Sequence, residues 1–284
     1  MRLPNRIGSS GPRRLVVAVA TWAVGLAFAA PLLWILINSL RRNDQIFTST
    51  YPLSWRSFLP QPATWANYEL VLTGQFGRSV LNSLLVTVIA IVVGLFISAL
   101  AAYALAVLRF RGASFVFSVV VLGFLIPFDA VAVPLSNLFR SWGLANTYSG
   151  LILPGLASGF AIFILRQFFA AIPYELTEAA RLDGLGWWGV FWRIHLPLSR
   201  PALIGAGFTI FLFEWDSYLW PLLIATDPSM VLGPIALTAF NGQYKVEFGA
   251  IFAGSVLLTA VPMVLLLFFQ RYFTASLTTT GSKG

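Results

Sequence analysis

Six long apolar runs limit what this chain can fold into. They cover approximately residues 15–40, 79–108, 114–138, 148–171, 198–224 and 249–272. A helix of about 20 mainly apolar residues is long enough to cross the hydrocarbon core of a bilayer. The runs therefore predict an all-α membrane protein, with six transmembrane helices in one domain over residues 15–272.

Composition supports a membrane protein and argues against several other classes. Of the 284 residues, 58% are hydrophobic and 10% are charged, far below the roughly 25% charged residues of a soluble domain. The net charge is +8, but the arginines are dispersed between apolar runs, so no nucleic-acid partner is expected. No cysteine and one histidine leave little for redox or metal chemistry. The first run is long enough to span, which favours a retained helix over a signal peptide.

The distribution of basic residues predicts the orientation. Six spans put both termini on one side, and short cytoplasmic connections carry an excess of Lys and Arg. With the termini inside, 12 of the 18 Lys and Arg residues lie on the cytoplasmic side. We therefore expect a multi-pass protein of the cytoplasmic (inner) membrane, with cytoplasmic tails at 1–14 and 273–284. Three external connections are expected: a loop at 41–78 rich in Pro and Trp, a short one near Asn146, and a longer one at 226–248.

The longest cytoplasmic connection, residues 172–197, contains a polar island that reads EAARLDGLGWWGVFWRIHLP from Glu178. Pro173 suits a first helical turn, acids follow near the positive end of the helix, and Gly184 can close it. The pattern predicts a short helix, a turn and a second helix over Trp187–His195. An ordinary amphipathic surface helix would have a similar pattern. His195 is expected at the membrane interface rather than in a proton relay.

The residue order of this polar segment is a more specific indication of function than its amphipathicity. The order is Glu-Ala-Ala, Gly184 four residues after Ala180, then nine intervening residues, then Ile-x-Leu-Pro. It resembles the EAA loop of permease subunits of binding-protein-dependent ABC importers. Phe76–Thr87, Ile126–Pro154 and Phe213–Leu222 also resemble the carbohydrate branch of that family, of the maltose-permease type.

The resemblance implies an ABC importer type I permease fold that supplies half of a heterodimeric pore in the lipid bilayer. It also implies a second homologous permease subunit, an extracellular solute-binding protein and two ATP-binding subunits, which would hold the ATP and Mg. This chain would have no cofactor and no catalytic or metal-binding residue, consistent with its lack of a G-x-x-x-x-G-K-[ST] loop. By resemblance, the residues that couple the chain to the ATPase are Glu178, Ala179, Ala180, Arg181, Asp183, Gly184, Ile194, Leu196 and Pro197. The alanines would let the helix approach its socket closely, and a side chain at 184 would obstruct the turn.

A second set of residues is predicted to line the solute pathway. Ionisable groups inside spans are costly and are functional hypotheses by default. Asp129 lies between Pro127 and Pro134, prolines that free backbone carbonyls and so imply a water-lined cavity. Acids beside aromatic faces suit a sugar, although such groups also join helices and could join the two permease halves. The residues in this set are Asp129, Glu214, Trp215, Asp216, Tyr218 and Trp220. Relatives read nearer Trp-Asn-Glu-Phe where this chain has Trp215 to Tyr218.

The sequence therefore predicts a transport subunit, not an enzyme, which moves a sugar or sugar-like solute by alternating access while partner subunits hydrolyse ATP. One alternative is an ion-coupled secondary transporter, although no internal repeat is evident. Another is an ABC importer for a non-sugar solute such as glycerol 3-phosphate. A membrane-embedded enzyme is disfavoured, because the acids and His195 are not predicted to converge.

Overall fold

The computed structural model describes residues 11–48, 55–60, 62–242 and 245–280. Within these ranges the secondary structure is helical, apart from one isolated antiparallel bridge between Asn241 and Val246. The predicted all-α class is confirmed. The predicted tail at 1–14 lies mostly outside the described residues, as do the last four residues of the tail at 273–284.

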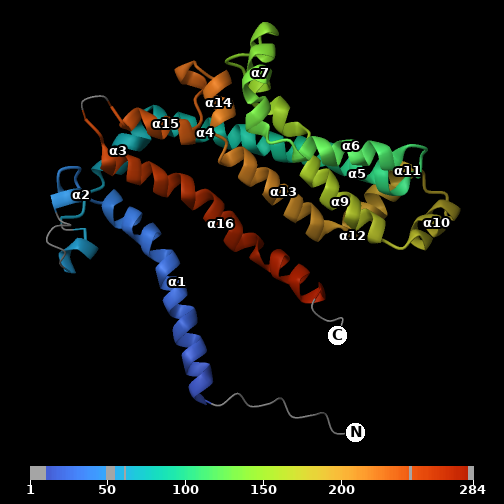
Figure 1. Cartoon of the computed structure of the whole chain (residues 1–284), viewed down its shortest axis with the longest axis horizontal. Helices are drawn as coiled ribbons and strands as arrows, with labels where there is room; N and C mark the ends of the chain where they lie inside the picture. The colour runs from blue at the N-terminus through green and yellow to red at the C-terminus, as the bar shows by residue number, and fades with distance from the viewer. Residues whose placement is uncertain (1–10, 49–54, 61, 243–244, 281–284) are drawn as a thin grey trace. The chain divides into compact units, whose positions relative to one another are not determined.

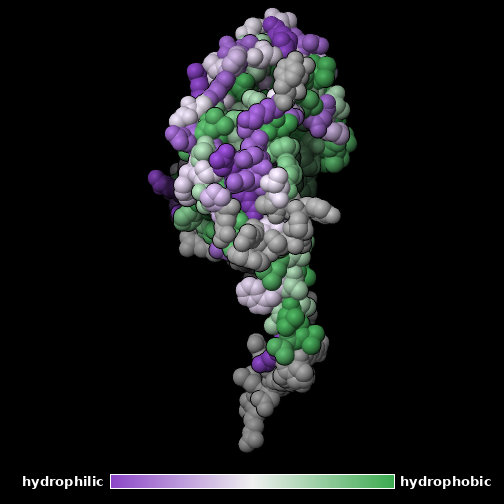
Figure 2. Space-filling view, turned by 90° about the vertical axis from the view of Figure 1, so that its left-hand side faces the viewer, coloured by the Kyte–Doolittle hydropathy of each residue, from purple (hydrophilic) through white to green (hydrophobic). Residues whose placement is uncertain are grey.

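The chain divides into two compact units, residues 1–71 with 240–257 and residues 72–239 with 258–284. The helices of the first unit follow in chain order: α1 (Gly11–Ser39), α2 (Gln45–Thr48), η1 (Trp55–Phe58), most of α3 (Ala66–Thr73), and the start of α16 (Phe248–Thr280). Figure 2 shows apolar side chains along the outside of α1, and no residue in the most apolar stretch of this helix is buried. A helix that is apolar all round needs lipid or protein around it, as a spanning helix does.

The external loop predicted at 41–78 is held together by a buried arginine. Arg41 is 2% exposed and donates to the backbone oxygens of Ser57 (2.7 Å) and Leu59 (3.0 Å) and to Asn38 Oδ1 (3.1 Å). Burial lowers the pKa of Arg41. Asn67 donates to the Ser39 and Arg41 oxygens. A buried cation is stable only with such a set of acceptors, so Arg41 fixes the described residues around it, Asn38, Ser57 and Leu59, in place.

The second unit contains the remaining helices. In chain order they are α4 (Gln75–Ile89), η2 (Ala90–Gly94), α5 (Leu95–Val107), α6 (Ala113–Leu125), α7 (Phe128–Ser141), α8 (Tyr148–Ile152), η3 (Leu153–Leu156), α9 (Gly159–Ala171), α10 (Tyr174–Leu182), α11 (Trp187–Val190), η4 (Phe191–His195), α12 (Leu196–Leu198), α13 (Arg200–Trp215), α14 (Leu219–Ile224), η5 (Pro228–Met230), α15 (Gly233–Ala236) and η6 (Leu237–Phe240), with the last part of α16. Of these, η2 and η4 are turns of π-helix.

Four stretches are long and apolar enough to cross a membrane as single helices: Arg14–Ser39, Gln75–Val107, Tyr148–Ala171 and Phe248–Gln270. Two helix pairs, α6 with α7 and α11–α12 with α13, pass the same test together but bend by 93° and 82°. The predicted number of six spans results only if each pair is counted as one span. The first pair falls in the predicted third span, which is broken at Pro127 because proline at this position removes a backbone donor. The second bend lies at the start of the predicted fifth span, because α11 and α12 belong to the segment predicted as the EAA loop.

Small residues let the helices of the second unit pack closely. Figure 1 shows α5, α6, α9 and α13 side by side, and α5 packs against α9 most extensively. The buried residues between them include Ala99, Ala102, Leu165 and Ala206. Membrane helices associate through close backbone approach at such small side chains. This packed group supports the segment from α10 to α12.

Candidate functional site

The EAA segment forms the predicted helix and turn. Helix α10 covers Tyr174–Leu182, with Pro173 immediately before it and Glu175 in its first turn. At its end Leu185 N donates to Ala180 O (3.0 Å) and Gly184 N to Arg181 O (3.1 Å). Gly184 has φ +87°, the left-handed conformation that closes many helices. A side chain at 184 was expected from the sequence to obstruct the turn, but a Cβ there would touch nothing within 4 Å of this chain. The requirement for glycine comes instead from its backbone angle.

The second arm is longer than predicted and is wound irregularly. The expected helix over Trp187–His195 consists of α11 and the π-turn η4, and it continues through α12 to Leu198. The bend of 82° then leads into α13. Any displacement of this arm therefore acts directly on the first turn of the fifth predicted span.

The predicted coupling residues fall into two groups by burial. Glu178, Ala179, Arg181, Asp183 and Gly184 are exposed. Ala180 is 5% exposed and belongs to the hydrophobic core, while Ile194 and Leu196 are half-buried against that core, and Pro197 is half-buried. The expectation that both alanines approach a partner is wrong for Ala180, because its methyl group packs inside this chain.

Arg181 contacts its own hairpin. Its Nη1 donates to Leu185 O (2.9 Å), and its guanidinium carbon lies 4.6 Å from the centre of the Trp187 ring. A cation over an aromatic face at this distance is attracted by the ring quadrupole. Arg181 therefore stabilises the turn between the two arms.

A buried polar and aromatic cluster lies beneath the hairpin, and sequence reasoning did not find it. His195 is 2% exposed, so its side chain is packed inside the chain. Its Nε2 lies 3.1 Å from Thr177 Oγ1 on α10. The His195 ring is also contacted edge-on by Tyr103 and Phe169. The sequence contained little indication of this cluster. Only the three-residue spacing of Thr177 and Ala180 places these two residues on one helix face.

The acids predicted for the solute pathway are not brought together. Asp129 is exposed in the first turn of α7, where a negative charge suits the helix end. Glu214 is half-buried on α13, where its carboxylate lies so near Gly155 that a Cβ there would overlap it. Asp216 is exposed after the end of α13. Among the described residues, no group of three or more His, Asp or Glu side chains could hold a metal ion.

The two predicted pathway tryptophans are packed and hydrogen-bonded. Trp215 is 2% exposed and its Nε1 donates to Leu258 O (3.1 Å) on α16. Trp220 is 4% exposed, and its Nε1 donates to Gly150 O (3.1 Å). Both indoles therefore have their single donor satisfied inside the protein, while Tyr218 remains exposed. Trp220 also contacts Phe128, the residue before Asp129, edge-on at 5.8 Å.

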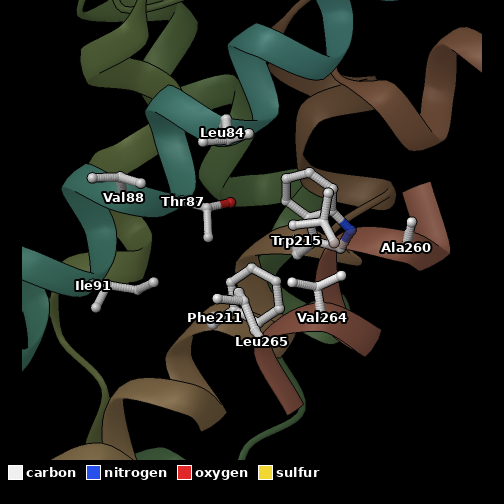
Figure 3. A pocket seen from close by; sticks show the side chains of 10 residues that line it. Leu84, Thr87, Val88, Ile91, Phe211, Trp215, Ala260, Val264 and Leu265 are labelled. Atoms are coloured by element: carbon white, nitrogen blue, oxygen red, sulfur yellow. The ribbon is translucent and has the colours of Figure 1, made fainter. Parts of the chain in front are cut away.

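Trp215 also lines an apolar cavity of about 470 Å³ (Figure 3). The walls come from α4, η2, α13 and α16, and the side chains are Leu84, Thr87, Val88, Ile91, Phe211, Trp215, Ala260, Val261, Val264 and Leu265. The Thr87 hydroxyl is buried and lacks a hydrogen-bond partner among the described residues. A sugar site needs several convergent polar groups, so this cavity in its present form is not one.

Asn82 joins α4 to the connection at 226–248, which was predicted to be external. Its Nδ2 donates to the backbone oxygens of Ser229 (2.9 Å) and Val231 (3.1 Å), and its Oδ1 accepts from Tyr148 (2.9 Å). In the same loop, hydrogen bonds from Ser229 lower the pKa of Asp227. These hydrogen bonds fix the conformation of residues 227–231, at the beginning of the loop that follows the fifth predicted span.

Comparison with known proteins gives consistent results. The family model described as "Binding-protein-dependent transport system inner membrane component" matches residues 90–279. The arabinooligosaccharides transport system permease protein AraQ of Halalkalibacterium halodurans is 35% identical over 96% of this chain and 100% of its own length. The sn-glycerol-3-phosphate transport system permease protein UgpE of Yersinia pestis is 33% identical over 87% of this chain and 89% of its own.

A solved structure shares the fold. A bacterial ABC transporter involved in the import of the acidic polysaccharide alginate matches with a TM-score of 0.80 at 22% identity, over 95% of this chain and 100% of the matched chain. At this identity the match supports the predicted permease fold and carries no information on the solute.

Proposed function

Because this chain belongs to the family of binding-protein-dependent transport system inner membrane components, and within it to the carbohydrate branch of ABC importer permeases, we propose that it moves a sugar across the cytoplasmic membrane by alternating access. The chain has no chemistry of its own in this proposal. Two separate ATP-binding subunits supply the energy, a second homologous permease completes the pore, and an extracellular binding protein delivers the solute.

The observation that carries the proposal is the exposure of the motif residues on α10. Glu178 and Ala179 are exposed on a helix only nine residues long, and Asp183 and Gly184 are exposed in the turn that follows it. The same segment has its other face buried in the core through Thr177 and Ala180. A helix anchored on one face and exposed on the other suits docking into a partner. Of the Glu-Ala-Ala motif, Glu178 and Ala179 are on the exposed face and Ala180 is on the buried one.

The orientation follows from the same assignment. An EAA segment that meets an ATPase must lie in the cytoplasm, which puts both termini there and places Asn146 and the loop after the fifth span outside. The excess of basic residues around the termini and this segment supports that orientation. ATP-driven closure of the partner subunits then displaces α10, and the bend before α13 passes that displacement to the fifth span.

For the solute, we propose a neutral oligosaccharide in preference to glycerol 3-phosphate. The relative named for arabinooligosaccharides supports the first, and the relative named for sn-glycerol-3-phosphate supports the second. The polar residues proposed for the pathway are the acids Asp129, Glu214 and Asp216 and the exposed Tyr218. Acids repel a phosphate ester at short range, whereas they accept hydrogen bonds from sugar hydroxyls. Trp215 and Trp220 contribute by shaping this region.

The test is uptake by membrane vesicles that contain the chain with its partner subunits and binding protein. Labelled arabinooligosaccharide should accumulate only when ATP is present on the side of residues 172–197, and it should still accumulate when a protonophore removes the proton gradient. Excess glycerol 3-phosphate should not compete. Uptake that follows the proton gradient at constant ATP would instead favour the ion-coupled secondary transporter.

A further inference from the structure

Helix α10 needs tertiary contacts to hold its position. Isolated helices shorter than about 12–15 residues are marginal in water, and α10 has nine residues. Of its residues only Thr177 and Ala180 are buried, at 1% and 5% exposure. The helix therefore presents a small buried face, and the contacts of that face decide where it lies.

The Thr177 hydroxyl makes the polar contact of this face. It lies 3.1 Å from His195 Nε2, which belongs to the second arm of the hairpin, 18 residues further along the chain. Both residues are nearly inaccessible to solvent, so no water competes for the bond. A hydrogen bond between buried groups is costly to break, because the hydroxyl and the ring nitrogen are then left without partners.

His195 is in turn fixed by rings from two membrane helices. Tyr103 of α5 meets the imidazole edge-on at 5.2 Å, and Phe169 of α9 meets it at 5.6 Å. Phe191 lies 5.1 Å from Tyr103 in the same cluster. The His195 Nδ1 has no hydrogen-bond partner in the part of the chain that the structure describes, so Thr177 supplies the one hydrogen bond that orients the ring.

Two further contacts join this hairpin to the span that contains α5. The Tyr103 hydroxyl donates to Trp187 O (2.9 Å) at the start of the second arm. The Arg109 guanidinium lies 3.7 Å from the centre of the Tyr174 ring, at the start of α10. Tyr103 therefore contacts both the ring that holds α10 and the backbone of the second arm.

From these contacts we infer that Thr177, His195 and Tyr103 are positioning residues, which fasten the exposed EAA helix to α5 and α9 so that a displacement of α10 moves both spans. The inference rests on the proposed coupling function. It goes beyond that function because none of the three residues belongs to the EAA signature. In this arrangement the Thr177–His195 contact adds a non-covalent route from α10 to the membrane helices, beside the covalent connections to α9 and, through the second arm, to α13.

The absence of native cysteine allows a direct test on the full chain in lipid vesicles. A spin label on Leu182→Cys reports on α10, because this side chain is 88% exposed at the end of the helix. Thr177→Val removes the hydroxyl at nearly constant shape, and His195→Phe removes the nitrogens and keeps a ring. Thr177→Ser retains the hydroxyl, and Glu175→Gln changes an exposed side chain of the same helix.

We expect Thr177→Val and His195→Phe to increase the mobility of the label, and Thr177→Ser and Glu175→Gln to leave its spectrum unchanged. The double variant Thr177→Val/His195→Phe should be no more mobile than the single variants, because both remove the same bond. Identical spectra for all variants, or equal mobility of the Ser and Val variants, would overturn the inference whatever the protein transports.

The second readout uses the complete transporter in membranes. Loss of the bond should lower the amount of solute taken up per ATP hydrolysed by about two- to tenfold, the effect expected of one buried hydrogen bond, while the amount of inserted protein stays constant. A mobile α10 with unchanged uptake per ATP would overturn the proposed transmission. Uptake without any ATP dependence in the unsubstituted chain would instead contradict the proposed function, and would leave the spectral result standing.

Discussion

The EAA segment at 172–197 and the aromatic segment at 213–220 differ in how their unusual residues are used. Both interrupt apolar sequence with acids and aromatic rings. In the first segment the motif acids are exposed and the anchoring residues are buried beneath them. In the second the tryptophans are buried with their donors satisfied, and the acids are separated by the end of α13. Similar residue types in a membrane protein are therefore exposed in one place and take part in helix packing in another.

The largest effect is expected for Gly155→Ala, in the region that packs against the aromatic segment. The added Cβ would overlap the Glu214 carboxylate, and overpacking of this kind costs about 1–3 kcal/mol. Thermal unfolding in detergent should show the loss, and Glu214→Ala in the same chain should recover most of it. A stable Gly155→Ala variant would mean that Glu214 is free to move, which would sharpen its case as a pathway residue.

Gly184→Val should have the next largest effect, and it should act on transport. A β-branched residue at φ +87° costs about 1–2 kcal/mol, so the turn after α10 changes shape. We expect ATP-dependent uptake to fall by about five- to thirtyfold, the same energy expressed as a ratio, with insertion unchanged. Gly184→Asn is the matched control, since asparagine tolerates the left-handed region, and it should retain more activity than the valine variant.

Trp215→Phe should have a smaller effect, and it should act on stability. The change keeps a ring in place but removes the donor to Leu258 O, and hydrogen bonds between membrane helices contribute about 0.6 kcal/mol on average. A lower unfolding temperature with an unchanged KM for uptake would support the packing role. An altered KM at unchanged stability would indicate that Trp215 contacts the solute, and would contradict the packing role assigned to the aromatic segment.

The smallest effect on stability is expected for Asp216→Asn. The side chain is exposed, and surface substitutions of this kind usually stay within about 0.5 kcal/mol. Unfolding measurements on the purified chain check this expectation. A larger loss would show that Asp216 holds the end of α13, contrary to the division between exposed acids and buried aromatics.

Local signals in the sequence predicted local structure well. The length of the apolar runs predicted an all-helical membrane chain, and Gly184 marked the turn, because these effects act within a few residues. Pro127 was predicted to free backbone carbonyls, but a break of the third span was not predicted. The EAA spelling identified the hairpin for the same reason. The 93° angle between α6 and α7 was not predictable, since a proline permits a break without setting its direction.

What the sequence could not predict depends on partners far along the chain. Trp215 bonds to a residue 43 positions away and Trp220 to one 70 positions away, so nothing near either residue indicates burial. His195 looked interfacial because its neighbours are charged and aromatic. Its burial depends on Tyr103 and Phe169, which belong to two other helices.

Cross-linking from the end of α10 tests most directly whether this helix meets an ATPase. Leu182→Cys is suited to it because that side chain is 88% exposed, whereas Ala180 is buried. Ser141→Cys, also exposed but predicted to lie on the opposite side of the membrane, is the control. In native membranes treated with a short bifunctional reagent, we predict that Leu182→Cys captures an ATP-binding subunit and Ser141→Cys does not. Capture of no ATP-binding protein from correctly inserted Leu182→Cys chain, or equal capture from both positions, would contradict the coupling role.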